Sequence, residues 1–268
     1  QVIGPPNDFL EVVDLSIVSG PHDSAVLFRK SDGSLWGVGD QHSGLSSSPQ
    51  QIRGVGVIQI ASGYEMQSAN LFVEGDALWG MGYDQYGELG MGTYDFFNTH
   101  GNFGNHSATP RQIVGSGVSD VFSFSSGTFQ NTTFFVKTNG SLQALGYGGL
   151  GALGVTLPGF SDAGNTFYPI GTSTPVQVVG AGVKEVSGYP KSWTSVNPGK
   201  IVYLKTDGSL WGWDLFENEY AGGPNPLAVP TKSQIVASGV DRLIQANTLA
   251  NHLLFLKTDG SLWGMGDN

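Results

Sequence analysis

The sequence predicts an all-β fold built from one repeated unit. Three observations support this prediction: 41 glycines among 268 residues, an aromatic fraction of 11%, and no sustained apolar period of 3.6 residues. Glycine-rich turns between short strands of aromatic and β-branched residues are typical of β proteins. Amphipathic helices need the 3.6-residue period. We therefore expect almost no helix.

One six-residue string recurs five times along the chain. Its full form, Asp-Gly-Ser-Leu-Trp-Gly, begins at residues 32, 207 and 259, and altered copies begin at Gly75 and Asn139. The leucine of the string falls at positions 35, 78, 142, 210 and 262. Recurrence at such intervals indicates a repeat architecture.

Each copy of the string lies between two predicted strands. The Asp-Gly or Asn-Gly pair forms a hairpin turn because these residues tolerate positive φ. An apolar segment upstream, such as residues 57–63, predicts a further strand. A Gln-apolar pair downstream, such as Gln51-Ile52 or Gln112-Ile113, predicts a fourth strand. Four short antiparallel strands per unit predict the blade of a β-propeller.

We predict a single domain of five four-stranded blades. Their approximate bounds are residues 5–53, 54–114, 115–179, 180–236, and 237–268 together with 1–4. The last unit stops after its third strand, and residues 1–4 resemble the fourth strand at residues 112–115. We therefore expect velcro closure between the N- and C-terminal strands, which would leave no open sheet edge.

The repeats resemble those of the RCC1 family (regulator of chromosome condensation type). Residues 255–268 resemble the middle of the family repeat, residues 83–93 its following loop, and residues 20–24 its Gly-x-His-x-Ser corner. The resemblance covers essentially the whole chain and implies an RCC1-like β-propeller of the bacterial secreted or surface branch. It departs in blade number, because the family commonly has seven.

The resemblance implies binding rather than one particular activity. Family members include a nucleotide-exchange factor, a plant photoreceptor and a secreted β-lactamase inhibitor, which share protein binding across one face of the ring. Sites of this kind are grafted onto a common fold. The resemblance also implies structural roles for His22 and His252 and for the repeat tryptophans.

Charge and composition exclude several classes of partner. The net charge is −10 and the pI is near 4.7, so nucleic-acid binding is not expected. No apolar run approaches the roughly 20 residues that a membrane helix needs. The chain has no cysteine, so it has neither a disulfide framework nor a thiolate zinc site. We expect a bacterial protein that lies outside the cell or on its surface.

The connections between third and fourth strands are the candidate site for a partner. They are long in the middle three units, at residues 83–110, 147–175 and 213–230. Equivalent loops of a propeller emerge on one side. Aromatic rings can stack on sugars or anchor a protein interface, so a protein or a glycan is the expected partner. The candidate side chains are Tyr86, Tyr94, Phe96, Phe97, His100, Phe103, His106, Tyr168, Trp213, Phe216 and Tyr220.

Metal binding is not predicted, and no cofactor is expected. Asp214, Glu217 and Glu219 form a weak Ca²⁺ candidate, but their spacing is not that of an EF-hand and a solvated acidic loop is the favoured interpretation. His100 and His106 have no known ligand spacing.

The predicted function is a non-enzymatic extracellular interaction module that presents its insertion loops to a protein or glycan. The chain has no nucleophile elbow, HExxH string or phosphate-cradling loop, which argues against an enzyme. The alternative is a self-assembling structural subunit of a larger cell-surface or filamentous assembly. A propeller-type carbohydrate-active hydrolase or lyase, with carboxylates gathered from several blades, is a further alternative.

Overall fold

In the computed structural model, most of the described residues lie in β-strands. The described residues are 11–19, 24–39, 45–63, 69–84, 86–91, 106–125, 131–157, 160–162, 165–167, 171–190, 199–215, 230–244 and 252–266. Across these ranges the one helical element is a short 3-10 turn. The described residues contain no helix that is long and apolar enough to cross a membrane. The predicted all-β fold is confirmed.

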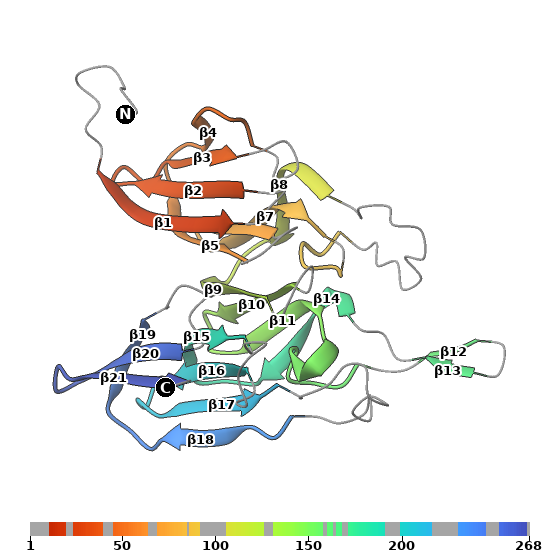
Figure 1. Cartoon of the computed structure of the whole chain (residues 1–268), viewed down its shortest axis with the longest axis vertical. Coiled ribbons are helices and arrows are strands. Elements are labelled where there is room, and N and C mark those ends of the chain that lie inside the picture. Colours follow the sequence, from red (N-terminus) through yellow and green to blue (C-terminus); the bar gives the residue numbers. More distant parts are fainter. Residues whose placement is uncertain are drawn as a thin grey trace.

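The described strands form four four-stranded antiparallel sheets and one three-stranded sheet, which we number 1 to 5 along the chain (Figure 1). Sheet 1 holds β1 (Val12–Ser19), β2 (Ser24–Lys30), β3 (Leu35–Gly39) and β4 (Gln50–Arg53). Sheet 2 holds β5 (Val57–Ser62), β6 (Ala69–Glu74), β7 (Ala77–Tyr83) and β8 (His106–Val114). Sheet 3 holds β9 (Val118–Ser125), β10 (Asn131–Lys137), β11 (Leu142–Tyr147) and β14 (Gly171–Val179).

The remaining two sheets follow the same order. Sheet 4 holds β15 (Val183–Tyr189), β16 (Lys200–Lys205), β17 (Leu210–Asp214) and β18 (Ser233–Val236). Sheet 5 holds β19 (Val240–Ile244), β20 (His252–Lys257) and β21 (Leu262–Gly266). The connection from β11 to β14 also contains the turn η1 (Gly149–Gly151) and a separate hairpin of β12 (Phe160–Asp162) and β13 (Asn165–Phe167).

The repeated string builds the hairpin between the second and third strands of each sheet. In sheet 1 the Asp32 carboxylate accepts the backbone N–H of Ser34 at 2.8 Å, and Gly33 has a φ of 81°. The indole N–H of Trp36 then donates to the Ser34 hydroxyl at 3.0 Å. The same two bonds recur in sheets 4 and 5, at Asp207–Ser209–Trp211 and Asp259–Ser261–Trp263.

The last glycine of the string lets a loop leucine approach the strand. A Cβ on Gly80 would lie 2.5 Å from the Leu89 side chain, and one on Gly37 would lie 2.8 Å from Leu45. Both leucines are buried. Because glycine has no side chain, this position leaves room for a leucine of the connection that follows.

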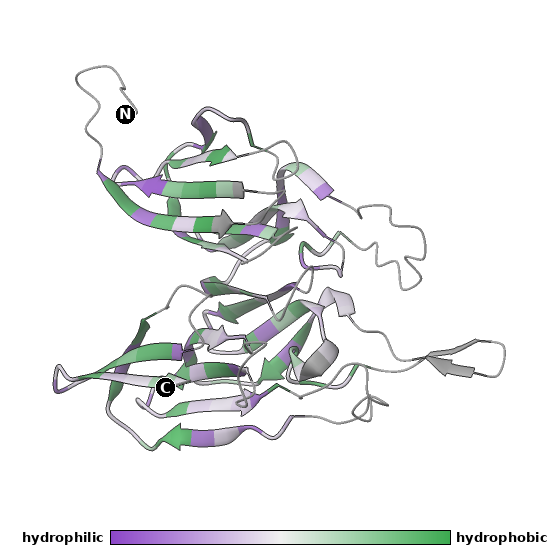
Figure 2. Ribbon diagram, viewed as in Figure 1, coloured by the Kyte–Doolittle hydropathy of each residue, from purple (hydrophilic) through white to green (hydrophobic). Residues whose placement is uncertain are grey.

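The apolar core lies between consecutive sheets. The cluster between sheets 1 and 2 joins Leu27 and Leu35 to Ile60, Phe72 and Met81. Three further clusters join sheets 2 and 3, sheets 3 and 4, and sheets 4 and 5. Figure 2 shows hydrophobic residues in green along the strands of both the upper and lower sheets. An inner sheet therefore buries one face on its predecessor and the other on its successor.

Closure of the ring is not seen in the described residues. β21 pairs only with β20 there, and Leu262 on β21 is 59% exposed. At the other end of the row of sheets, Leu15 and Ile17 on β1 are 55% and 52% exposed. The outer faces of sheets 1 and 5 are thus not packed on each other. The predicted closing strand at residues 1–4 lies outside the described residues, so velcro closure stays a prediction.

The loss of stability on truncating the repeat leucine should depend on which sheet carries it. Leu78→Ala in sheet 2 should lower the free energy of unfolding by about 2–5 kcal/mol, because Leu78 is completely buried and its loss leaves a cavity. Leu262→Ala, the matched control at the same repeat position in sheet 5, should cost less than about 1 kcal/mol. Urea unfolding followed by tryptophan fluorescence, at monomeric concentrations, measures both. Equal losses would contradict the open arrangement.

Candidate interaction surface

Strand direction brings the variable connections to one side of the molecule. β3, β7, β11 and β17 are the third strands of sheets 1 to 4, and each is followed by the connection to a fourth strand. The β12–β13 hairpin belongs to the connection in sheet 3 and projects away from the sheets, at the right of Figure 1. We call this side the loop side.

A buried carboxylate shapes the base of the connection in sheet 2. Asp84 follows β7 and accepts the backbone N–H groups of Leu89 at 2.6 Å and Met91 at 3.3 Å. Burial raises the pKa of Asp84 to about 6, and the two N–H donors oppose that rise. The Glu88 carboxylate accepts the N–H of Tyr86 at 2.7 Å. These bonds fix Asp84 against residues 86–91 in a compact arrangement.

This turn is also attached to sheet 3. The Thr133 hydroxyl donates to the carbonyl of Glu88 at 2.8 Å. The Tyr86 ring meets the Tyr147 ring edge-on, with centroids 5.0 Å apart. Gly87 has a φ of 89°, and a Cβ on it would lie 2.6 Å from the backbone of Ser173. The base of the connection of sheet 2 therefore lies directly on the neighbouring sheet.

The connection of sheet 3 is attached to sheet 4 in the same way. The indole N–H of Trp213 donates to the carbonyl of Gly151 at 3.1 Å. A Cβ on Gly154 would lie 2.7 Å from the Trp213 ring. The Lys232 ammonium donates to the carbonyl of Gly154 at 2.6 Å and lies 5.4 Å from the centroid of the Trp213 ring. Two successive loop bases are thus bonded to the next sheet.

The predicted partner-binding residues differ in how exposed their side chains are, and several of them lie outside the described residues. Tyr86 is half-buried at the loop base, and His106 is exposed at the start of β8, with its ring 6.4 Å from that of Tyr83. Trp213 was predicted to contact a partner, and this is wrong for the structure as it stands. Its side chain is completely buried in the core between sheets 3 and 4. The other predicted residues, Tyr94, Phe96, Phe97, His100, Phe103, Tyr168, Phe216 and Tyr220, lie outside the described residues.

The acidic candidate for Ca²⁺ is described only in part. Asp214 is exposed and forms an ion pair with Lys200, while Glu217 and Glu219 lie outside the described residues. Among the described residues no group of three or more His, Asp or Glu side chains could hold a metal ion.

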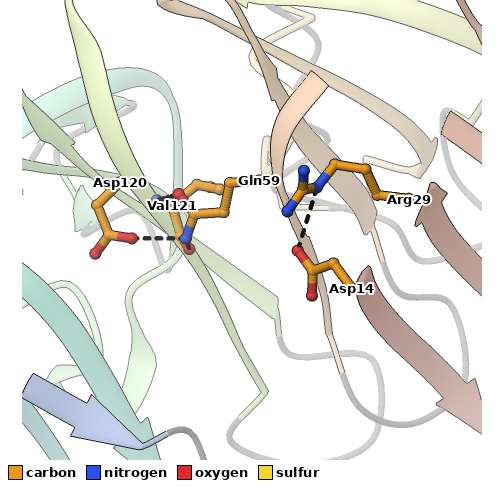
Figure 3. A network of polar contacts seen from close by, with 5 residues as sticks. All are labelled: Asp14, Arg29, Gln59, Asp120 and Val121. Atoms are coloured by element: carbon orange, nitrogen blue, oxygen red, sulfur yellow. Dashed lines mark hydrogen bonds and ion pairs between the residues drawn. The ribbon is translucent and has the colours of Figure 1, made fainter. Parts of the chain in front are cut away.

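Sequence reasoning missed a row of polar links between the first strands of neighbouring sheets. The side-chain oxygen Oε1 of Gln59 accepts the backbone N–H of Val121 at 3.3 Å, and its side-chain amide nitrogen Nε2 donates to the Asp120 carboxylate at 2.6 Å. The Asp120 carboxylate in turn accepts the N–H of Val186 at 3.1 Å. Figure 3 shows the Gln59–Asp120 contact beside the Asp14–Arg29 pair of sheet 1.

The same repeat position supplies the link in each of the first four sheets. Glu185 of sheet 4 accepts the N–H of Leu243 at 2.7 Å, and Asp14 of sheet 1 is hydrogen-bonded by the backbone of Ile60. The residue directly follows an irregularity in strand pairing. The irregularity in strand pairing cannot be predicted from the sequence. The polar residue that precedes an apolar one at the same place in each first strand could, however, have marked the linking position.

Burial raises the pKa of the central carboxylate in this row. Desolvation raises the pKa of Asp120 to about 6, and the nearby Glu185 carboxylate adds to the rise, while the Gln59 amide and the Val186 N–H oppose it. Ionisation of Asp120 is therefore less favourable in the folded protein than in water.

Comparison with known proteins supports the fold. No family model and no curated protein sequence matches the chain. The structure is similar to that of human WBSCR16, with a TM-score of 0.58, 19% identity, and coverage of 96% of this chain and 64% of that one. It is similar to Prp20p from Saccharomyces cerevisiae, with a TM-score of 0.60 and 14% identity over 96% of this chain and 58% of that one.

A second structure of yeast RCC1 (Prp20), bound to Kap60, gives a TM-score of 0.59 at 17% identity, over 96% of this chain and 56% of that one. The chain thus spans less than two thirds of the length of these solved structures. At such identities the likeness shows the fold alone, which is that of an RCC1-type propeller.

The close approach of Gly87 to the backbone of Ser173 allows a test of whether the loop base of sheet 2 is attached to sheet 3. Gly87→Ala should destabilise the fold by about 1–3 kcal/mol more than Gly75→Ala, because added volume in a packed site forces neighbours apart. Gly75 is the matched control, since it also has a positive φ but a Cβ there meets nothing within 4 Å. Urea unfolding measures both variants. Equal costs would show that the loop base can lift off sheet 3.

The raised pKa of Asp120 predicts a pH dependence of stability. The native pKa of about 6 exceeds the ordinary 3.8, so the native state binds more protons between these values. The contribution of Asp120 to the free energy of unfolding should therefore fall by up to about 3 kcal/mol as pH rises from 4 to 6, and then level off. Asp120→Asn should remove this contribution. The wild-type advantage over the variant should be larger at pH 4 than at pH 7, and an advantage that grew with pH would contradict the assignment.

Proposed function

We propose that this protein is a non-enzymatic interaction module whose loop side binds a protein. The observation that carries the proposal is the bonding of two successive loop bases, those of sheets 2 and 3, onto the next sheet. Thr133 holds the turn at Glu88, and Trp213 and Lys232 hold the turn at Gly151 and Gly154. The bases of these two connections are thereby held in fixed relative positions, which lowers the entropy lost when a partner binds across them.

The solved structures of similar fold support a protein partner as a class. Prp20p has binding properties towards Gsp1p and histones, and the second yeast structure is a complex with Kap60. Those partners belong to those proteins. The net charge of −10 here favours a partner with a basic surface and disfavours nucleic acid.

The extracellular location and the glycan partner expected from the sequence rest on composition. The segment 94–106 combines aromatic, amide and histidine side chains, which suits either a sugar or a protein. Glycan binding is therefore the competing outcome of the test below.

Site-specific photo-crosslinking tests the loop side. A photoreactive phenylalanine analogue replaces His106, which is exposed on the loop side, and in a control protein replaces Val55, which is 71% exposed in the β4–β5 turn on the opposite side. We expect protein adducts from the source cells and their medium at position 106 and not at position 55. Identical adducts at both positions, or none at 106 together with binding on a glycan array, would overturn the proposal of a protein partner.

A further inference from the structure

The two ends of the row of sheets carry the same apolar positions that are buried between inner sheets. The first valine of each first strand is 49% exposed at Val12 and 1–3% exposed in the other four sheets. Those four are Val57, Val118, Val183 and Val240. The next shared position is exposed at Leu15 and buried at Ile60, Val121 and Val186. Sheet 1 thus presents one complete half of an inter-sheet contact.

Sheet 5 presents the opposite half. The repeat leucine packs towards the following sheet, and it is completely buried in sheets 1 to 4 but mostly exposed at Leu262. Trp263 beside it is 50% exposed. The faces at the two ends are therefore the two different partners of one kind of contact, not two copies of one face.

Backbone groups at the ends match in the same way. The hairpin turn of each of sheets 1 to 4 accepts an N–H from the first valine of the next sheet. These bonds are Val57 to Gly33 at 3.1 Å, Val118 to Asp76 at 2.9 Å, Val183 to Gly140 at 2.9 Å and Val240 to Gly208 at 3.0 Å. At the ends, Val12 holds the donor position and Gly260 holds the acceptor position.

Charge at the ends is also complementary. The position that links first strands is held by Asp14, Gln59, Asp120 and Glu185, and in sheet 5 by Arg242. Within the structure the Gln59 amide donates to the Asp120 carboxylate of the following sheet at 2.6 Å. Arg242 is an exposed donor at the same position of sheet 5. The matching carboxylate on sheet 1 is Asp14, whose side chain is 34% exposed.

We propose that sheet 5 of one molecule packs on sheet 1 of a second copy of this chain. The apolar positions and the turn carbonyl with its N–H partner repeat an arrangement that the chain already uses four times. The Arg242–Asp14 pair repeats the contact between Gln59 and Asp120. The contact joins two different faces, so it is head-to-tail and allows chains of molecules or larger rings. It leaves the loop side open and goes beyond the proposed function.

Two blocking variants test the head-to-tail contact. Leu262→Glu disables the sheet 5 end, and Leu15→Glu disables the sheet 1 end. Both sites are exposed, so the variants should fold, which circular dichroism checks. By light scattering and sedimentation velocity, the wild type should form oligomers whose mass rises with concentration. Each variant alone should stay monomeric, and an equimolar mixture should form 1:1 dimers and nothing larger. Val55→Glu, the exposed control, should behave as wild type.

Cysteine pairing provides an independent readout, since the chain contains no cysteine. A chain with Arg242→Cys mixed with one carrying Asp14→Cys should form disulfide-linked dimers between the two variants faster than either variant dimerises alone. A monomeric wild type at all concentrations would overturn the proposal. So would a monomeric mixture of the blocking variants, or cross-linking no faster in the mixture. A monomer whose Trp263 is shielded from acrylamide quenching would instead indicate closure within one molecule.

Discussion

Face-to-face packing of consecutive sheets is the interaction on which the rest of this structure depends. No single sheet has an interior of its own, because each is one layer thick and its apolar side chains alternate between two faces. The repeat leucine fills one face, and the phenylalanine or tyrosine of the second strand fills the other, as Leu78 and Phe72 do in sheet 2. Stability therefore resides in the contacts between sheets, as in other repeat proteins.

Polar links between first strands give that packing its register. Apolar contact alone tolerates sliding, whereas a hydrogen bond from Val186 N–H to the Asp120 carboxylate does so only over a few tenths of an ångström. The link has a cost, because Asp120 loses its solvation and its pKa rises to about 6. The same use of buried carboxylates occurs at the loop side, where Asp84 bonds two backbone N–H groups of the following turn. Positional precision is thus obtained from buried acids at both places.

Much of the fold could be predicted from the sequence because its determinants are local. The Asp-Gly turn and the serine that accepts the tryptophan indole both act within one hairpin, so five copies of the string predicted five hairpins. The candidate site was harder. Trp213 was predicted to contact a partner, but Gly151 and Gly154 come from another sheet and enclose it, and nothing near residue 213 in the sequence encodes that enclosure. The links through Gln59 and Asp120 depend on a pairing irregularity that has no local signature. Closure depends on the angle summed over all sheets, which side-chain packing sets.

The first valine of each sheet reports whether that sheet is covered by another. Amide hydrogen exchange of the full chain, measured residue by residue across a range of protein concentrations, tests the open row of sheets most directly. Exchange at Val57, Val118, Val183 and Val240 should be slow at every concentration, because each N–H is bonded to the turn of the preceding sheet. Exchange at Val12 should be fast in dilute solution and should slow as the concentration rises and a second copy covers sheet 1. Slow exchange at Val12 in the dilute monomer would contradict the open row, since it would mean that sheets 1 and 5 already cover each other within one molecule.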